Sequence, residues 1–201
     1  MKAVVINAGP KRKDFNAQLA QSARDGAESA GAEVKYVDLY KLDLSGCRSC
    51  FICKRDEEEC KCFWKDELSP LIEEIFNADV LLISVPIFFS QPTSHYMAFF
   101  ERLIFSLVSF KTGNKFKGSI NAGLFYTTEY PLEYFEKSVR PHVKTSEDLL
   151  KMLNGKVVVD AFSKIPKSML SQVSEDELKS KEEQMAEDLN RTYEIGAELC
   201  Q

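Results

Sequence analysis

Five short apolar runs alternate along this chain with segments whose apolar residues recur at helical spacing. The runs cover residues 2–7, 33–39, 79–89, 119–128 and 156–162, and the helical segments cover 14–31, 66–78, 94–107, most of 130–153, and 175–199. Alternation of this kind predicts βαβ units, and therefore an α/β fold with a parallel sheet covered by helices on both faces. The 201 residues contain no repeat and no low-complexity linker. We therefore expect a single doubly wound domain over residues 1–201.

In a doubly wound sheet, ligands bind outside the carboxyl ends of the strands, where the strand order reverses. The segment after the first run, NAGPKRKDFNAQL, leads from a strand into a helix N-terminus, where unpaired N–H groups favour a phosphate. Lys11, Arg12 and Lys13 add positive charge, and Asn16 and Gln18 add donors. The segment is neither a Walker A loop nor a G-x-G-x-x-G fingerprint. An ordinary strand-to-helix loop is the alternative.

Two further segments follow the third and fourth runs. Phe88 and Phe89, flanked by Pro86 and Ser90, predict an apolar slot with polar ends, as in sites for flat aromatic ligands; the alternative is that both phenylalanines pack in the core. The segment YTTEYP, residues 126–131, groups two hydroxyls, a carboxylate and an aromatic ring. Its alternative role is helix capping by a threonine.

Five of the six cysteines lie within residues 47–62. The chain begins without an apolar leader and has no apolar run of the ~18 residues that span a bilayer, so we expect a soluble, cytoplasmic protein whose thiols stay reduced. Cys47, Cys50 and Cys53 recur every three residues, and Cys60 follows, which favours an iron–sulfur cluster. A zinc site and metal-free thiols remain alternatives. Cys62 is an alternative fourth ligand to Cys60.

The three loops and the cysteine segment together resemble the flavodoxin-like NAD(P)H-dependent FMN reductase superfamily, in particular its iron–sulfur flavoprotein branch. The resemblance implies a five-stranded parallel sheet of order 2-1-3-4-5. It also implies the following FMN-binding residues: Lys11, Arg12, Phe15, Asn16 and Gln18 near the phosphate; Pro86, Ile87, Phe88, Phe89 and Ser90 along the ribityl chain and ring; and Thr127, Thr128 and Glu129 near the pyrimidine edge. The chain departs from the family pattern at Ala8 and Ala17, which replace hydroxyl residues, and at Phe88, which replaces a tyrosine.

The function implied by this resemblance is an oxidoreductase that uses FMN to pass electrons from NAD(P)H, or a reduced carrier, to an acceptor. A quinone, a flavin and a ferredoxin-type iron–sulfur partner are candidate acceptors. The cysteine loop, about residues 45–65, would hold a [4Fe-4S] cluster through Cys47, Cys50, Cys53 and Cys60. We expect a homodimer or homotetramer with no membrane partner, and the net charge of −5 argues against nucleic acid. The alternative function is a non-enzymatic electron carrier, or a thiol or zinc module without flavin.

Overall fold

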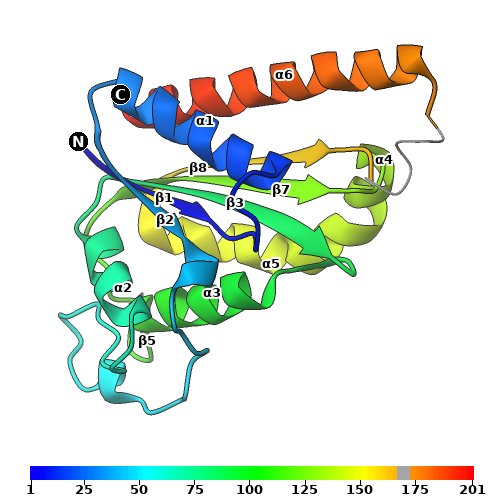
Figure 1. The fold of residues 1–201 in the computed structure, drawn as a ribbon. Coiled ribbons are helices and arrows are strands. Elements are labelled where there is room, and N and C mark those ends of the chain that lie inside the picture. Colours follow the sequence, from blue (N-terminus) through cyan, green and yellow to red (C-terminus); the bar gives the residue numbers. More distant parts are fainter. Residues whose placement is uncertain (167–172) are drawn as a thin grey trace.

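A twisted parallel sheet forms the centre of the molecule in a computed structural model that describes residues 1–166 and 173–201 (Figure 1). Its strands are β1 (Lys2–Asn7), β2 (Glu33–Asp38), β3 (Val80–Phe88), β7 (Ile120–Thr128) and β8 (Asn154–Ser163). They pair in parallel in the order β2-β1-β3-β7-β8. The five predicted strands and their predicted order are therefore confirmed. The sequence did not predict the two-residue strands β4 (Gln91–Pro92), β5 (Val108–Ser109) and β6 (Gly113–Asn114).

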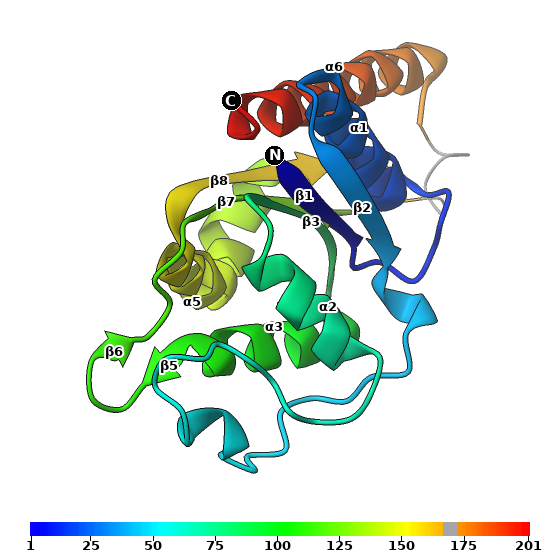
Figure 2. The same ribbon diagram turned by 90° about the vertical axis from the view of Figure 1, so that its left-hand side faces the viewer.

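Helices cover both faces of the sheet. One face carries α1 (Phe15–Ser29) and α6 (Glu175–Leu199), and the other carries α2 (Leu68–Phe76), α3 (Ser94–Leu107) and α5 (Arg140–Leu150) (Figures 1 and 2). The predicted helical stretch 130–153 is divided into α4 (Leu132–Tyr134), a π turn (Phe135–Val139), α5 and a 3₁₀ turn (Lys151–Leu153). Within the described part of the chain, no helix has both the length and the apolar character needed to cross a membrane.

The strands are apolar on both sides because two separate cores lie against the sheet. In β1, Val4 and Ile6 point into the core formed with α2, α3 and α5, whereas Ala3 and Val5 point into the core formed with α1 and α6. This alternation follows from the two-residue period of a strand. Strand β3 is buried over its whole length except Phe88, as expected for a central parallel strand.

Helices α1 and α6 cross closely because a glycine lies on each at the contact. A Cβ atom on Gly196 would stand 2.1 Å from the carbonyl oxygen of Ala23, far inside van der Waals contact. We expect Gly196→Val to lower the free energy of unfolding by about 3 kcal/mol, because the helices must separate or bend. Urea unfolding measures this. The control is Ala186→Val on the exposed part of α6, expected to cost under about 1 kcal/mol, and equal losses would refute the close-crossing explanation.

Candidate functional site

A hydrogen-bond network centred on Asn16 ties together the carboxyl ends of three strands. Asn16 lies in the first turn of α1 and is 1% exposed. Its Nδ2 donates to Asn7 Oδ1 (2.8 Å) and to the carbonyl oxygen of Ser84 (3.2 Å). Its Oδ1 accepts from Ser84 Oγ (2.8 Å) and Thr127 Oγ1 (3.1 Å). These four bonds use the full capacity of the amide, so Asn16 supports the site from behind rather than offering a donor to a phosphate.

The loop between β1 and α1 is shaped by Asn7. Its Oδ1 accepts from the Gly9 N–H (3.0 Å), and its Nδ2 donates to the carbonyl oxygen of Lys11 (3.0 Å). A Cβ atom on Gly9 would lie 2.9 Å from Asn16 Nδ2, so the loop passes too close to the network for a larger residue. The backbone of this loop is therefore held in one path, with the Lys11 side chain exposed to solvent.

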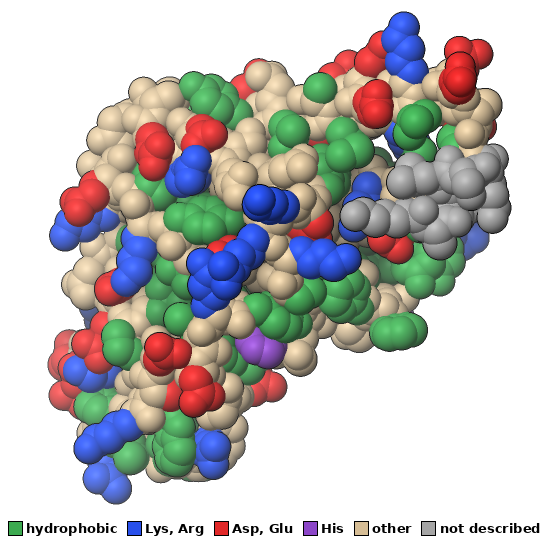
Figure 3. Space-filling view, in the orientation of Figure 1, with side chains coloured by type: hydrophobic (Ala, Val, Ile, Leu, Met, Phe, Trp, Pro, Cys, Tyr) green, Lys and Arg blue, Asp and Glu red, His purple; other side chains and the backbone are tan. Residues whose placement is uncertain are grey.

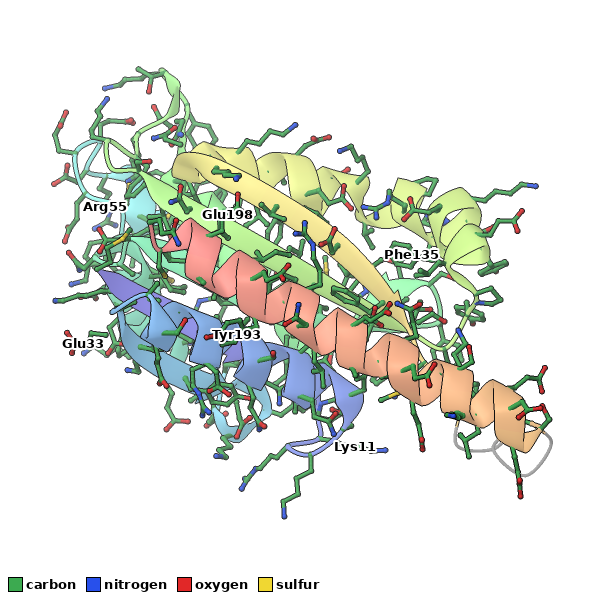
Figure 4. All side chains as sticks on the ribbon, turned by 90° about the horizontal axis from the view of Figure 1, so that it is seen from above. Lys11, Glu33, Arg55, Phe135, Tyr193 and Glu198 are labelled. Carbon is green, nitrogen blue, oxygen red and sulfur yellow. The ribbon has the colours of Figure 1, made fainter. Side chains whose placement is uncertain are left out.

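The positive charges predicted here lie on the surface at the start of α1. Lys11, Arg12 and Lys13 are all exposed, and Asp14 caps the helix by accepting a hydrogen bond from the Ala17 N–H (3.1 Å). Figure 4 shows Lys11 projecting from the loop before α1, on the side toward which α6 extends. The positive end of the α1 dipole and three cations thus face the same region.

Asp38, at the end of β2, neutralises part of this charge. Burial raises its pKa, but hydrogen bonds from Lys41 and Asn7 and the nearby Arg12 guanidinium outweigh burial and hold the pKa below its usual range. The distance from Arg12 Nε to Asp38 Oδ2 is 3.8 Å. Arg12 is therefore partly engaged within the protein, whereas no ion pair involving Lys11 or Lys13 is found among the described residues.

The turn between β3 and β4 displays two aromatic side chains. Phe89 and Ser90 both adopt left-handed backbone conformations, with φ of +51° and +61°. Phe89 is 95% exposed and Phe88 48% exposed, which excludes the alternative that they pack in the core. Two consecutive non-glycine residues in this region are strained, and such strain is often kept at functional sites.

A cavity of about 290 Å³, here called the rim cavity, lies where these strand ends meet. It is lined by Pro10, Lys11, Asp14, Pro86, Ile87, Phe88, Phe89, Thr127, Thr128, Glu129, Tyr130 and Lys164. Eight of these residues were predicted for the site, and they come from three separate segments. Sequence reasoning missed Pro10, Asp14, Tyr130 and Lys164. Lys164 follows the fifth strand, so the rule that ligands bind at strand ends would have found it.

The remaining predicted residues lie elsewhere. Neither Asn16 nor Ser90 is found in the lining of the rim cavity among the described residues, and Asn16 is buried, where it hydrogen-bonds Asn7. Arg12, Phe15 and Gln18 line a neighbouring cavity of about 890 Å³, here called the basic cavity, which Lys11, Asp14 and Lys164 share with the rim cavity. Its other lining residues are Lys13, Ile165, Leu178, Lys181, Glu182 and Met185. Figure 3 shows several Lys and Arg side chains gathered near the middle of this face of the molecule.

The cysteine loop lies beside the C-terminal half of α3, away from the rim cavity (Figures 1 and 2). Two lysines hold its backbone. Lys115, 2% exposed, donates from Nζ to the carbonyl oxygens of Cys53 (2.6 Å), Asp56 (2.8 Å) and Glu59 (2.5 Å). Lys54 donates to the carbonyl oxygen of Val108 (2.7 Å) at the end of α3. A loop with little regular structure is thereby fixed to the body of the protein.

The thiols of this loop do not converge on one point. Over residues 1–166 and 173–201, no group of three or more His, Cys, Asp or Glu side chains is arranged to hold a metal ion. A small cavity of about 20 Å³ is nevertheless lined by four thiols, those of Cys47, Cys50, Cys53 and Cys62. Cys60 was predicted as the fourth ligand, but it is not among the residues described for this cavity. Burial raises the pKa of the Cys53 thiol despite Lys54 and Lys115 nearby.

A buried arginine contacts this cavity. Arg102 on α3 is 2% exposed, and its Nε donates to Cys62 Sγ (3.3 Å). Its other guanidinium nitrogens donate to the carbonyl oxygen of Ser45 (3.0 Å), to Ser69 Oγ (2.7 Å) and to the Asp66 carboxylate, with which it forms an ion pair. The arginine thus links both ends of the cysteine loop to α2 and α3.

Curated relatives of the chain carry the name iron–sulfur flavoprotein. One from Methanocaldococcus jannaschii is 24% identical over 123 residues, which are 61% of this chain and 62% of the relative. One from Methanosarcina thermophila is 22% identical over 124 residues, 61% of this chain and 63% of the relative. The chain thus matches less than two thirds of the length of each of these proteins.

Solved structures show the same fold. An NAD(P)H:quinone oxidoreductase from Methanothermobacter marburgensis superposes with a TM-score of 0.73 at 18% identity, covering 99% of this chain and 96% of that one. An azoreductase from Bacillus anthracis gives 0.69 at 13% identity, covering 98% and 99%. An archaeal flavodoxin gives 0.55 at 13% identity, covering 100% and 96%, so the predicted flavodoxin-like fold is confirmed.

The sequence profile of the NADPH-dependent FMN reductase family matches residues 1–130, which include β1, α1, the cysteine loop, β3 and β7. All three loops of the rim cavity lie within or next to this range. The family assignment made from the sequence is thereby confirmed: the chain belongs to the NADPH-dependent FMN reductase family.

Proposed function

We propose that this protein is an oxidoreductase that binds FMN in the rim cavity and uses it to pass electrons from NAD(P)H to an acceptor. The observation that carries the proposal is the meeting of eight predicted residues from three strand ends around one cavity. Membership in the FMN reductase family supports both the cofactor and the nicotinamide donor. When bound, FMN supplies the hydride and electron transfer chemistry, and the protein supplies binding and orientation.

The residues of the rim cavity fit FMN in chemical character, with a lysine near the helix N-terminus and apolar residues along one wall. Lys11 and the N–H groups at the start of α1 would hold the phosphate. Ala8 and Ala17 are fully buried and carry no hydroxyl, so the lysines and the backbone N–H groups would bind the phosphate without them. Pro86, Ile87 and Phe88 would pack along the flavin, as apolar walls do in sites for flat ligands.

The polar residues at the opposite edge are mostly engaged within the protein. Thr127 donates its hydroxyl to Asn16, and Thr128 accepts from the Tyr130 N–H (3.0 Å). Glu129 pairs with Lys164, with 3.4 Å between Oε1 and Nζ. We therefore propose that this edge meets the pyrimidine ring through backbone groups and that the threonine hydroxyls stiffen the turn.

Anaerobic turnover tests this function and separates it from the alternative of an electron carrier. Purified protein is supplied with FMN, a quinone and either NADPH or NADH, and the loss of absorbance of the reduced nucleotide is followed. Oxidation at many turnovers per chain is expected. Bound FMN without turnover would favour the carrier, and protein that takes up no FMN would contradict the proposal.

Finer features of the function are also proposals. We infer a quinone-type acceptor, with a ferredoxin-type partner as the alternative, and a homodimer or homotetramer in the cytoplasm. Phe89, almost fully exposed beside the rim cavity, supports a contact with a second molecule, because large apolar side chains exposed at a site usually mark an interaction. The cysteine loop contacts the C-terminal end of α3, whereas the rim cavity is lined by residues at the carboxyl ends of the strands. We infer from this that electrons pass between subunits or to a carrier rather than within one chain.

We further propose that the cysteine loop holds an iron–sulfur cluster through Cys47, Cys50, Cys53 and Cys62, with Cys62 in place of the predicted Cys60. Four cysteines line this one small cavity, and they would have to move closer together to bind a cluster of several irons, in which each thiolate binds its own iron. The hydrogen bond from Arg102 to Cys62 further supports this choice, because such donors stabilise thiolates and orient ligands.

The iron content of two single variants tests the ligand set. After anaerobic reconstitution, we expect Cys62→Ser to lose most of its iron and its absorption near 400 nm, whereas Cys60→Ser keeps both and serves as the matched control. FMN content should be unchanged in both variants. Loss of iron in Cys60→Ser alone would restore the original prediction, and zinc in place of iron in the wild type would support the zinc alternative.

A further inference from the structure

Lys115 is a buried cation surrounded by backbone oxygens. Its side chain is 2% exposed, and its Nζ donates to the carbonyl oxygens of Cys53 (2.6 Å), Asp56 (2.8 Å) and Glu59 (2.5 Å). These bonds use all three donors of the ammonium group. A buried ammonium is costly unless it is paired or fully hydrogen-bonded, and here the cysteine loop supplies the hydrogen-bond acceptors. The lysine and the loop therefore depend on one another.

The three acceptors form what we call the carbonyl cage. They belong to every third residue from Cys53 to Glu59, so residues 53–59 curl around the ammonium as a loop curls around a bound metal ion through its carbonyl oxygens. In residues 45–65, all of which the structure describes, the 3₁₀ turn Ile52–Lys54 is the only helix or strand. The cage thus supplies order that regular secondary structure gives elsewhere.

A hairpin outside the main sheet presents this lysine. Strands β5 and β6 pair in antiparallel fashion, and Lys115 follows β6 directly. Its backbone N–H donates to the carbonyl oxygen of Leu107 at the end of α3 (2.9 Å). In return, Lys54 of the cysteine loop donates to the carbonyl oxygen of Val108 in β5 (2.7 Å). Figure 2 shows the hairpin at the same end of the molecule as the cysteine loop. The position of the cage is therefore fixed relative to α3.

The cage influences where the cysteines on either side of it lie. Cys53 gives its carbonyl oxygen to the cage and also lines the small thiol cavity. Glu59 closes the cage at its other end, directly before Cys60. Cys60 is not found in the described lining of the thiol cavity, whereas Cys62 lines it and accepts a hydrogen bond from Arg102. Cys62 is therefore the first cysteine after the cage that reaches the cavity.

The charges around the thiols agree with this placement. Burial raises the pKa of the Cys60 thiol, and Lys115 is the first of three lysines whose charges oppose the rise. Burial raises the pKa of the Cys53 thiol as well, and there the nearby thiol of Cys62 adds to the rise. Cys60 thus lies among lysines, whereas Cys53 lies near another thiol.

We propose that Lys115 is a positioning residue that decides which cysteine joins Cys53 at the thiol cavity. By binding the carbonyl oxygens of residues 53, 56 and 59, its ammonium holds Cys60 outside the cavity and leaves Cys62 as the fourth thiol. Without the ammonium, these oxygens lose their shared partner, the loop opens and Cys60 reaches Cys53. The inference deepens the proposed cluster site, and it rests on that proposal only where iron is measured.

Disulfide mapping of the iron-free full chain tests the inference without a cluster. Diamide takes up the two hydrogens of a pair of thiols as one S–S bond forms, and peptide mass spectrometry then identifies the partner of Cys53. In the wild type we expect Cys53 to pair with Cys50 or Cys62. In Lys115→Met, Cys53–Cys60 pairs should become about tenfold more frequent, because hydrogen bonds to a charged group have been lost.

Two variants and one internal reporter control this test. Lys117→Met removes the same charge two residues away, at an exposed position outside the cage, and should keep the wild-type pairing. Lys115→Arg keeps a charged donor and should stay close to the wild type. Cys200, which is 5% exposed and far along the chain, stays reduced as long as a variant is folded. If Lys115→Met oxidises at Cys200, Lys115→Gln, which keeps two donors, replaces it with the same expected change.

Iron content separates this inference from the proposed cluster. After anaerobic reconstitution, we expect Cys62→Ser to lose iron in the wild-type background but to keep it in the Lys115→Met background, where Cys60 takes its place. Loss of iron in both backgrounds overturns the inference. So does an unchanged partner of Cys53 in folded Lys115→Met, or an equal change in Lys117→Met. A wild type that binds no iron contradicts the proposed cluster, while the disulfide pattern still decides the role of Lys115.

Discussion

Replacing Asn16 with alanine is expected to weaken FMN binding by about 100-fold and to lower the free energy of unfolding by about 3 kcal/mol. The substitution removes four hydrogen bonds and leaves the buried hydroxyls of Ser84 and Thr127 without the acceptor to which they donate, whereas Asn7 Oδ1 and the Ser84 carbonyl oxygen keep the N–H groups of Gly9 and Ala8. Each such group costs about 1–3 kcal/mol. Because Asn16 joins residues of three neighbouring strands, β1, β3 and β7, the loops around the rim cavity lose their alignment together. Flavin fluorescence titration and urea unfolding measure the two effects.

The control for this prediction is Asn190→Ala. Asn190 is exposed on α6, where its amide donates a hydrogen bond to the Glu194 side chain, so its loss should leave both FMN affinity and stability nearly unchanged. If Asn16→Ala lost stability but kept the wild-type FMN affinity, Asn16 would be a structural residue that does not organise the cofactor site.

Replacing Arg102 with methionine is expected to destabilise the protein by about 3–5 kcal/mol. The change leaves Asp66, whose side chain is 12% exposed, without its ion-pair partner, and removes donors to Ser45, Ser69 and Cys62. Breaking a buried ion pair from one side costs this much because the remaining charge has no compensation. Arg191→Met is the matched control. In its ion pair with Asp160, Arg191 is exposed and Asp160 is only partly buried, so the loss of the pair should cost at most about 1 kcal/mol.

The Arg102 variant should also change the response of stability to acid. Burial raises the pKa of Asp66, but the hydrogen bond and charge of Arg102 outweigh burial and hold that pKa below its usual range. A lowered pKa in the folded state means that the stabilisation is complete above the unfolded pKa of about 3.9 and is lost as the pH falls below it. Arg102→Met should abolish this loss. If the stability of the variant, measured by urea unfolding, still fell in acid as it does in the wild type, the acid dependence would come from carboxylates other than Asp66.

The fold could be predicted because its signals are local. The sequence pattern is strong in the apolar runs that form β1, β3 and β7 and in the helical stretches between them. The rules for βαβ connections then allow only a few strand orders, one of which is observed. The prediction of one helical stretch over residues 130–153 was less accurate. A π turn and a 3₁₀ turn interrupt this stretch, and the spacing of its apolar residues does not reveal them.

The candidate site could be predicted only where its residues adjoin strand ends. Phe88 and Thr127 follow that rule, whereas the role of Asn16 depends on partners 68 and 111 residues away. Lys115 likewise reaches carbonyl groups of the cysteine loop about sixty residues earlier in the chain. By spacing alone, Cys60 and Cys62 are equally suitable as the fourth ligand. Only the hydrogen bond from Arg102 and the position in the small cavity, both found for Cys62, distinguish them.

The central claim is that the ends of β1, β3 and β7 together form one FMN site. A crystal structure of the full chain grown with FMN tests it most directly. The account predicts the flavin ring beside Pro86, Ile87 and Phe88 and the phosphate at Lys11 and the start of α1. A rim cavity closed by the protein's own side chains, or FMN bound at another surface at full occupancy, would contradict it.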